Sequence, residues 1–230
     1  MEDKPQFECW ENEYRNPKLM TLGDRPQNDV LRFLKWLKKS KKVEVSALTI
    51  LDLGCGTGRN TNYLASLGNK VHGIDISKTA IRLARERAVG QNLATEYSVA
   101  SIGERLNINA NSIDLLLDVT SSNSLSEKER QIYLEESSRV LKNGGYFFVR
   151  ALCKDGDKNA KNLLTMSPGK EYDTYIMKDL GLVERVFSES DFKSMYSPFY
   201  KIEKLIRKSG YAKLNGQSYK RNYLIAYLQK

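Results

Sequence analysis

The sequence predicts an α/β fold: a mostly parallel sheet with helices on both faces, a C-terminal antiparallel strand and an N-terminal helical leader. Two observations support this prediction. Between residues 47 and 150, five apolar strand patterns are separated by helical patterns or loops, which indicates parallel strands joined by crossover connections. Residues 223–228 then alternate between two faces with a period of two, as in a sheet strand.

Length and composition are those of an ordinary globular domain. The chain has 230 residues, of which 40% are hydrophobic and 28% charged, so we expect one domain over 1–230. No run approaches the roughly 18 apolar residues of a membrane span, and the acidic start lacks the apolar region of a secretory signal. The three cysteines form no CxxC pair. We therefore expect no metal site, no membrane partner and a cytoplasmic location.

Local signals place the elements of the sheet. Ser77 can cap one helix, and Ser126 with Glu129 forms a capping box for another, which should end at Asn143-Gly144-Gly145. Residues 151–200 show no clear strand–helix unit. The final strand should pair with 201–206 or 211–214. The five parallel strands are expected at 47–53, 70–76, 95–100, 112–119 and 146–150.

Two basic segments flank a slightly acidic middle. Segment 31–42 has six basic residues and no acid, and 201–230 has eight basic residues against the single Glu203. Apolar residues at helical spacing predict that the first segment belongs to a surface helix beginning near Pro26. Such charge also suits an anionic partner such as RNA.

The stretch LDLGCGTGRN (51–60) has glycines at 54, 56 and 58, with Asp52 ahead of them. A dinucleotide loop reads G-x-G-x-x-G and a P-loop ends in G-K-[ST]; neither pattern occurs here. Asp52 would also repel a pyrophosphate. The pattern favours a cofactor that brings positive charge and no phosphate, such as S-adenosylmethionine (SAM). Asp75, about 20 residues after Gly54, suits an acid that accepts the hydroxyls of a ribose.

These segments resemble a known family. ILDLGCGTGRNTNYLASLG with VHGIDIS is similar to motifs I and II of the class I SAM-dependent methyltransferases, which have a Rossmann-like fold. SIDLLLDV and RVLKNGGYFFVR resemble the fourth and fifth strands of that family. The resemblance covers 45–150, and FSESDF with a terminal hairpin is similar to its small-molecule members. It implies a leader or lid (1–44), a SAM-binding core (45–150) and an acceptor side (151–230).

The resemblance also implies the cofactor contacts. The glycines would let the backbone approach SAM, with Asp52 near its methionine end, Asp75 on its ribose, and Ile76, Ser101 and Ile102 around its adenine. Many members have an aspartate where Ser101 stands. The full predicted set is Asp52, Gly54, Cys55, Gly56, Gly58, Asp75, Ile76, Ser101, Ile102 and Asp118.

The methyl acceptor is less well specified. The segment DVTSSNSLS (118–126) lacks the [DN]-P-P-[YF] typical of enzymes that methylate exocyclic amines. Asp118 is the candidate acceptor-facing acid, and the alternative interpretation is a strand-end residue bonded to loop amides. Trp10, Tyr14 and Arg15 would belong to the lid. Candidates for the acceptor wall are Tyr172, Tyr175, Tyr196 and Tyr200.

Three functional hypotheses remain at this stage. The first is a SAM-dependent methyltransferase with a small-molecule acceptor. The second is an RNA methyltransferase that uses the basic segments 31–42 and 201–230, and the third is a SAM-binding or nucleotide-binding module without catalysis. The sequence indicates neither the acceptor atom nor the oligomeric state.

Overall fold

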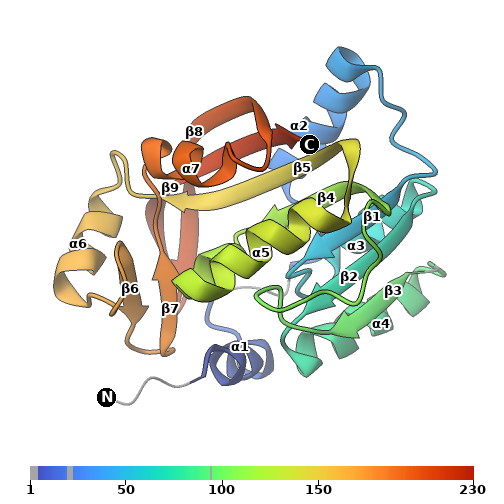
Figure 1. Cartoon of the computed structure of the whole chain (residues 1–230). Coiled ribbons are helices and arrows are strands. Elements are labelled where there is room, and N and C mark those ends of the chain that lie inside the picture. The colour runs from blue at the N-terminus through green and yellow to red at the C-terminus, as the bar shows by residue number, and fades with distance from the viewer. Residues whose placement is uncertain (1–4, 20–22, 94) are drawn as a thin grey trace.

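A computed structural model describes residues 5–19, 23–93 and 95–230 of the chain (Figure 1). A seven-stranded sheet crosses the molecule in the order β3-β2-β1-β4-β5-β9-β8. The first five strands pair in parallel, and β9 and β8 join antiparallel to them. The predicted mostly parallel sheet with a C-terminal antiparallel strand is confirmed.

The strand order reverses between β1 and β4, because β2 and β3 extend the sheet on one side of β1 and the later strands extend it on the other. Such a reversal opens a crevice at the carboxyl ends of the strands, where loops diverge to opposite faces. The strands are β1 (Thr49–Leu53), β2 (Lys70–Asp75), β3 (Glu96–Val99), β4 (Ile113–Val119), β5 (Leu141–Cys153), β8 (Lys201–Leu214) and β9 (Gln217–Gln229).

Helices cover both faces of the sheet (Figure 1). They bury the apolar side chains of the strands. On one face lie α2 (Asn28–Trp36), the π-helical η1 (Leu37–Lys41), α3 (Arg59–Ser66), α4 (Lys78–Gly90) and α6 (Lys158–Met166). On the other lie α5 (Glu127–Val140) and α7 (Glu189–Tyr196). Val30, Phe33, Leu34 and Leu37 are all buried, so the basic segment 31–42 packs its apolar side on the core as its periodicity predicts.

The helix caps agree with the sequence, but one helix end does not. Ser77 accepts a hydrogen bond from Ala80 N, and the capping box of Ser126 and Glu129 is present. The predicted stop of α5 at 143–145 is wrong by three residues. The helix ends at Val140 because Leu141 is fully buried and already pairs with Ile113 of β4 as the start of β5.

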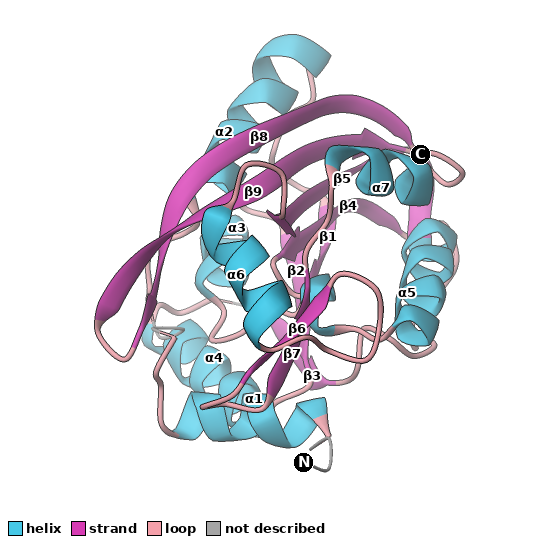
Figure 2. Cartoon of the chain, turned by 90° about the vertical axis from the view of Figure 1, so that its left-hand side faces the viewer, coloured by secondary structure: helices cyan, strands magenta, loops and turns pink. Residues whose placement is uncertain are grey.

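The region after β5 contains elements that the sequence did not reveal. Two four-residue strands, β6 (Thr174–Met177) and β7 (Leu182–Arg185), form a separate small sheet, between α6 and α7 in the chain (Figure 2). Strands this short carry too few residues to show an alternating pattern. Both candidate partners of the last strand, 201–206 and 211–214, belong to one long strand, β8, which forms a hairpin with β9.

Candidate functional site

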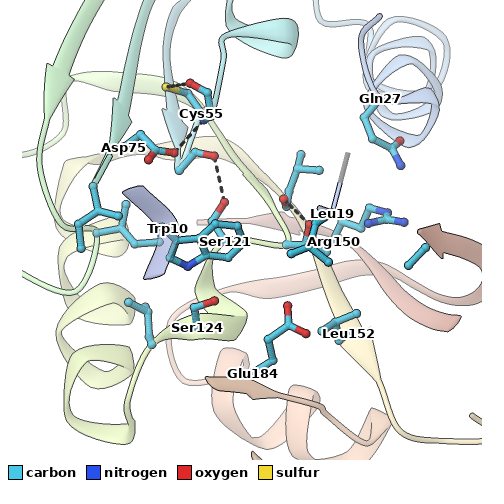
Figure 3. A pocket seen from close by; sticks show the side chains of 18 of the residues that line it. Trp10, Leu19, Gln27, Cys55, Asp75, Ser121, Ser124, Arg150, Leu152 and Glu184 are labelled. Atoms are coloured by element: carbon cyan, nitrogen blue, oxygen red, sulfur yellow. Dashed lines mark hydrogen bonds between the residues drawn. The ribbon is translucent and has the colours of Figure 1, made fainter. Parts of the chain in front are cut away.

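A cavity of about 550 Å³ lies at the carboxyl ends of β1, β2, β4 and β5. This volume is in the range of small-molecule and cofactor pockets. Its walls divide into two halves. Loops after β1, β2, β3 and β4 form the cofactor half, and the leader together with β5, β6, β7, β8 and β9 forms the acceptor half. Figure 3 shows Asp75 on one side of the cavity, with Arg150 and Glu184 on the side away from it.

The glycine loop after β1 is shaped by close contacts. Gly54 and Gly56 both have left-handed backbone angles, with φ of +71° and +56°. A Cβ on Gly54 would lie 2.2 Å from Ser121 Oγ, and one on Gly56 would lie 2.8 Å from Tyr14 Oη. The loop therefore needs glycine at both positions, first for the backbone conformation and then for packing. Ser121 Oγ also donates to Gly54 O at 3.1 Å, which joins this loop to the one after β4.

Asp75 lies at the end of β2 and on the cavity wall. Its carboxylate accepts hydrogen bonds from Gly56 N and Ser77 N, each at 2.9 Å, so its position is fixed. Burial raises the pKa of Asp75 to about 6, although these hydrogen bonds oppose the shift. A fixed carboxylate beside a glycine loop can accept two neighbouring hydroxyls, as the sequence suggests for a ribose.

An apolar slot continues beyond Asp75. Ile76, Ser101 and Ile102 all line the cavity, at the carboxyl ends of β2 and β3. Ser101 Oγ accepts a hydrogen bond from Gly103 N at 3.1 Å, so this serine stabilises its own loop. The resemblance implies that these three residues surround the adenine, and this assignment stays a prediction.

Three predicted cofactor residues do not line the cavity: Asp52, Gly58 and Asp118. Asp52 is buried beneath the loop, where its Oδ2 accepts from Thr61 Oγ1 at 2.7 Å, and burial raises its pKa to about 6. Gly58 packs against Tyr97 and Ala84. The structure therefore gives Asp52 and Gly58 a role in holding the loop, in place of the predicted cofactor contact.

Asp118 is fully buried, and the interpretation of it as an acceptor-facing acid is wrong. Its carboxylate accepts hydrogen bonds from Ser121 N at 2.8 Å, Ser122 N at 3.3 Å and Tyr133 Oη at 2.7 Å. The side chain organises the loop after β4 from behind. Ser121 and Ser124 of that loop reach the cavity instead.

Cys55 lines the cavity but is a buried loop residue. Burial, followed by the negative charges of Asp75 and Asp52, raises its pKa well above the ordinary value. The thiolate is therefore disfavoured, and nucleophilic chemistry at Cys55 with it. His72, the single histidine, lies within β2 with its Nε2 2.6 Å from Ser98 Oγ, and it does not border the cavity.

The leader helix α1 (Gln6–Arg15) covers the cavity with Trp10 and Tyr14. It is held by Glu11, whose carboxylate accepts from Ser77 Oγ and Thr79 Oγ1, both at 2.6 Å, at the start of α4. Burial alone would raise the pKa of Glu11, but these hydrogen bonds outweigh it and lower the pKa to about 2. Trp10 and Tyr14 thus lie where the sequence predicts a lid; Arg15 is exposed on the surface.

The tyrosines of the acceptor half are not those that the sequence suggested. Tyr172 is exposed, Tyr175 lies behind the cavity wall, and Tyr196 and Tyr200 belong to the core around α7. The cavity is lined instead by Tyr211, Tyr219 and Tyr223 of the β8–β9 hairpin. Strand alternation suggested that Tyr223 packs on the sheet, and it does so at the point where the sheet borders the cavity.

Glu184 is a carboxylate of the acceptor half that sequence reasoning missed. It projects from β7 toward the cavity (Figure 3) and accepts a hydrogen bond from Tyr175 Oη. Arg221 Nη1 donates to the same phenol oxygen at 2.9 Å, and Arg221 Nε donates to Asp157 Oδ2 at 3.2 Å. This buried chain of hydrogen bonds fixes Glu184 against the wall. No sequence pattern marks Glu184, because its strand has only four residues and belongs to no motif.

Arg221 lines the cavity, and two further arginines border it, Arg59 at the start of α3 and Arg150 near the end of β5. The guanidinium of Arg150 lies 3.5 Å from the ring centroid of Tyr223. Burial, followed by the charge of Arg150, lowers the pKa of Arg59. Among the described residues, no three or more His, Cys, Asp or Glu side chains are grouped to hold a metal ion.

Comparisons with known proteins agree with this geometry. A family model described as a methyltransferase domain matches residues 50–145. An uncharacterised methyltransferase of Schizosaccharomyces pombe is 32% identical over 105 residues, which cover 46% of this chain and 72% of that protein. The chain belongs to the class I SAM-dependent methyltransferases. It is therefore an enzyme, and its cofactor is SAM.

Further similarities extend beyond the matched core. A solved SAM-dependent methyltransferase of Methanosarcina mazei superimposes with a TM-score of 0.73 at 25% identity, covering 83% of this chain and 95% of that one. A ubiquinone biosynthesis O-methyltransferase of Pelagibacter ubique is 30% identical over 134 residues, 58% of this chain, and the alignment spans about half of that protein, 52%. Within the part of the methyltransferase that the structure describes, no helix has the length and apolar character needed to cross a bilayer.

Proposed function

We propose that this methyltransferase transfers the methyl group of SAM to a small molecule bound in the acceptor half of the cavity. The observation that supports this most is the enclosure of the acceptor half by α1, the β6–β7 sheet and the β8–β9 hairpin, next to the cofactor half. The similarity to a ubiquinone biosynthesis O-methyltransferase also favours a small acceptor. Cys55 and Cys153 are buried thiols that form no disulfide, which suits a reducing compartment such as the cytoplasm.

The residues of the cofactor half fit SAM. The glycine loop offers backbone without side chains, Asp75 offers a carboxylate for the ribose, and Ile76 with Ile102 offers an apolar slot for the adenine. At the other end of the loop, the N-terminus of α3 and the guanidinium of Arg59 offer positive charge for the carboxylate of the methionine part. SAM supplies an electrophilic methyl group on its sulfonium.

We infer that Glu184 receives a proton from the acceptor. Methyl transfer to a hydroxyl, amine or thiol leaves one proton to be removed, and a positioned carboxylate can accept it in the transition state. Among the acids on the cavity wall, Asp75 is engaged with backbone amides and Glu129 belongs to the capping box of α5. Glu184 lies on the acceptor side and is oriented by Tyr175 and Arg221.

A turnover assay tests the proposal. The purified chain with SAM is challenged with a panel of metabolites bearing hydroxyl, amine or thiol groups, and with total RNA, while release of S-adenosylhomocysteine is measured. We expect release with a small molecule. Methylation of RNA alone would favour the RNA alternative, and binding of SAM without turnover on either class would favour a non-catalytic module.

A further inference from the structure

In the acceptor half, Arg150 shares its carboxylate partner with two other cations. One buried carboxylate, that of Asp29, is shared by three cations: Arg32 at 3.3 Å, Arg150 at 3.6 Å and Lys208. Arg59 borders the cavity as well, and its charge interacts unfavourably with Arg150 and favourably with the buried Asp52. Of these three cations only Arg150 lines the cavity, and the shared carboxylate can neutralise its guanidinium only in part.

Only part of the Arg150 guanidinium is available to a ligand in the cavity, because the side chain is 14% exposed and its Nε is on the side of Asp29. Its guanidinium stacks on the Tyr223 ring, and its Nε is buried without a hydrogen-bond partner in the described part of the chain, because Asp29 at 3.6 Å is too far to accept. Stacking on an aromatic ring uses the face of a guanidinium and leaves its N–H groups in the plane. The backbone of Arg150 is fixed within β5, where its carbonyl accepts from Thr120 N at 2.8 Å.

We propose that the methyl acceptor carries an oxyanion, such as a carboxylate, and that Arg150 binds this group on the platform of Tyr223. The inference rests on the proposed small-molecule function. A guanidinium held in one plane matches the two oxygens of a carboxylate, and it discriminates strongly in a partly desolvated site. The bound anion would also relieve the repulsion between Arg150 and Arg59.

The methionine part of SAM also carries a carboxylate. The positions of Arg59 and Arg150 indicate which arginine binds the carboxylate of the cofactor and which binds the acceptor. Arg59 is the first residue of α3, directly after the glycine loop, whereas Arg150 lies beside Leu152 and Tyr223 on the acceptor side. Figure 3 shows Arg150 across the cavity from Asp75. We therefore assign the methionine carboxylate to Arg59 and the N-terminus of α3, and the acceptor oxyanion to Arg150.

Calorimetry on the full chain saturated with S-adenosylhomocysteine tests this assignment. The probes are benzoate and hexanoate, each compared with its neutral amide, benzamide or hexanamide. We expect at least one carboxylate to bind about tenfold more tightly than its amide, the scale of a charge-assisted hydrogen bond. Arg150→Gln should remove that preference and leave the affinity for S-adenosylhomocysteine within about threefold.

The matched control is Arg32→Gln. It removes another cation from Asp29, but Arg32 is exposed and does not line the cavity, so the carboxylate preference should persist. Thermal unfolding of both variants checks that they are folded, and Arg150→Lys, which keeps the charge without the planar fork, should retain part of the preference.

Two results would overturn the inference. One is a wild-type protein that binds each carboxylate no better than its amide. The other is an Arg150→Gln variant that loses affinity for S-adenosylhomocysteine but not for 5′-methylthioadenosine, which lacks the carboxylate; Arg150 would then belong to the cofactor. Either result leaves the proposed small-molecule function intact. That function has its own test and is rejected if methyl transfer occurs only to RNA.

Discussion

The two halves of the cavity are built in different ways. The cofactor half comes from loops that follow β1, β2, β3 and β4, and its glycine loop and Asp75 stand at strand ends that the sequence marks. The acceptor half is assembled from a leader helix, a small separate sheet and a long hairpin, which lie far apart in the chain. The cofactor half therefore follows from the parallel-sheet fold itself, whereas the acceptor half depends on segments that this chain adds to that fold. Four experiments test this division.

The largest effect is expected from Gly56→Val in the cofactor half. The substitution puts a branched side chain at φ +56°, with its Cβ 2.8 Å from Tyr14 Oη, so it distorts the loop and displaces the leader. We expect binding of S-adenosylhomocysteine to fall below detection by calorimetry while circular dichroism shows a folded protein. Gly90→Ala, where a Cβ meets no atom within 4 Å, is the control. Normal binding by Gly56→Val would mean that the loop is only a structural turn.

In the acceptor half, Glu184→Gln should lower kcat by about 10²–10⁴-fold on the acceptor that the metabolite panel identifies, the usual contribution of a general base. KM for SAM should hardly change, because Glu184 lies outside the cofactor half. Tyr175→Phe, which removes a hydrogen bond to the carboxylate but keeps the carboxylate itself, should cost much less. An unchanged kcat in Glu184→Gln would show that no proton is transferred to this residue.

A smaller effect is expected at the ribose site. Asp75→Ala should weaken S-adenosylhomocysteine by about 1–3 kcal/mol, the scale of hydrogen bonds to a charged group. The pKa of Asp75 is raised to about 6, and only the ionised carboxylate accepts from the backbone amides and from a ribose at the same time. Affinity in the wild type should therefore fall as the pH drops through about 6. Titration calorimetry at pH 5 and pH 8 should show this fall in the wild type and a flatter profile in Asp75→Ala.

The smallest effect is expected from surface charge away from both halves. Lys38, Lys39 and Lys42 lie near the end of the basic segment 31–42 and do not border the cavity. Replacing all three with glutamate should leave turnover on the small acceptor within a few-fold, because exposed lysines are normally solvated surface. RNA binding that is steep in salt, and that disappears together with methyl transfer in this variant, would support the RNA alternative.

The sequence was a good guide to the cofactor half and a poor one to the acceptor half, for a physical reason. A glycine loop and an acid at a strand end are local requirements of backbone and charge, so Gly54, Gly56 and Asp75 were recognisable without tertiary information. The sequence also showed carboxylates but not which way they face, and Asp118 proved to bond its own loop. Glu184, Arg150 and Tyr223 reach the cavity only through the pairing of distant segments, and no spacing rule connects them.

The leader helix touches both halves of the cavity and can therefore couple the binding of the two substrates. Tyr14 of α1 lies over the glycine loop, the same helix closes the acceptor half through Gln6, and Glu11 fastens it to α4. A ligand that is bound in one half of the cavity and holds this helix in place also preorganises the other half for its own ligand. By thermodynamic reciprocity, the acceptor should then tighten the binding of SAM by the same factor by which SAM tightens the binding of the acceptor.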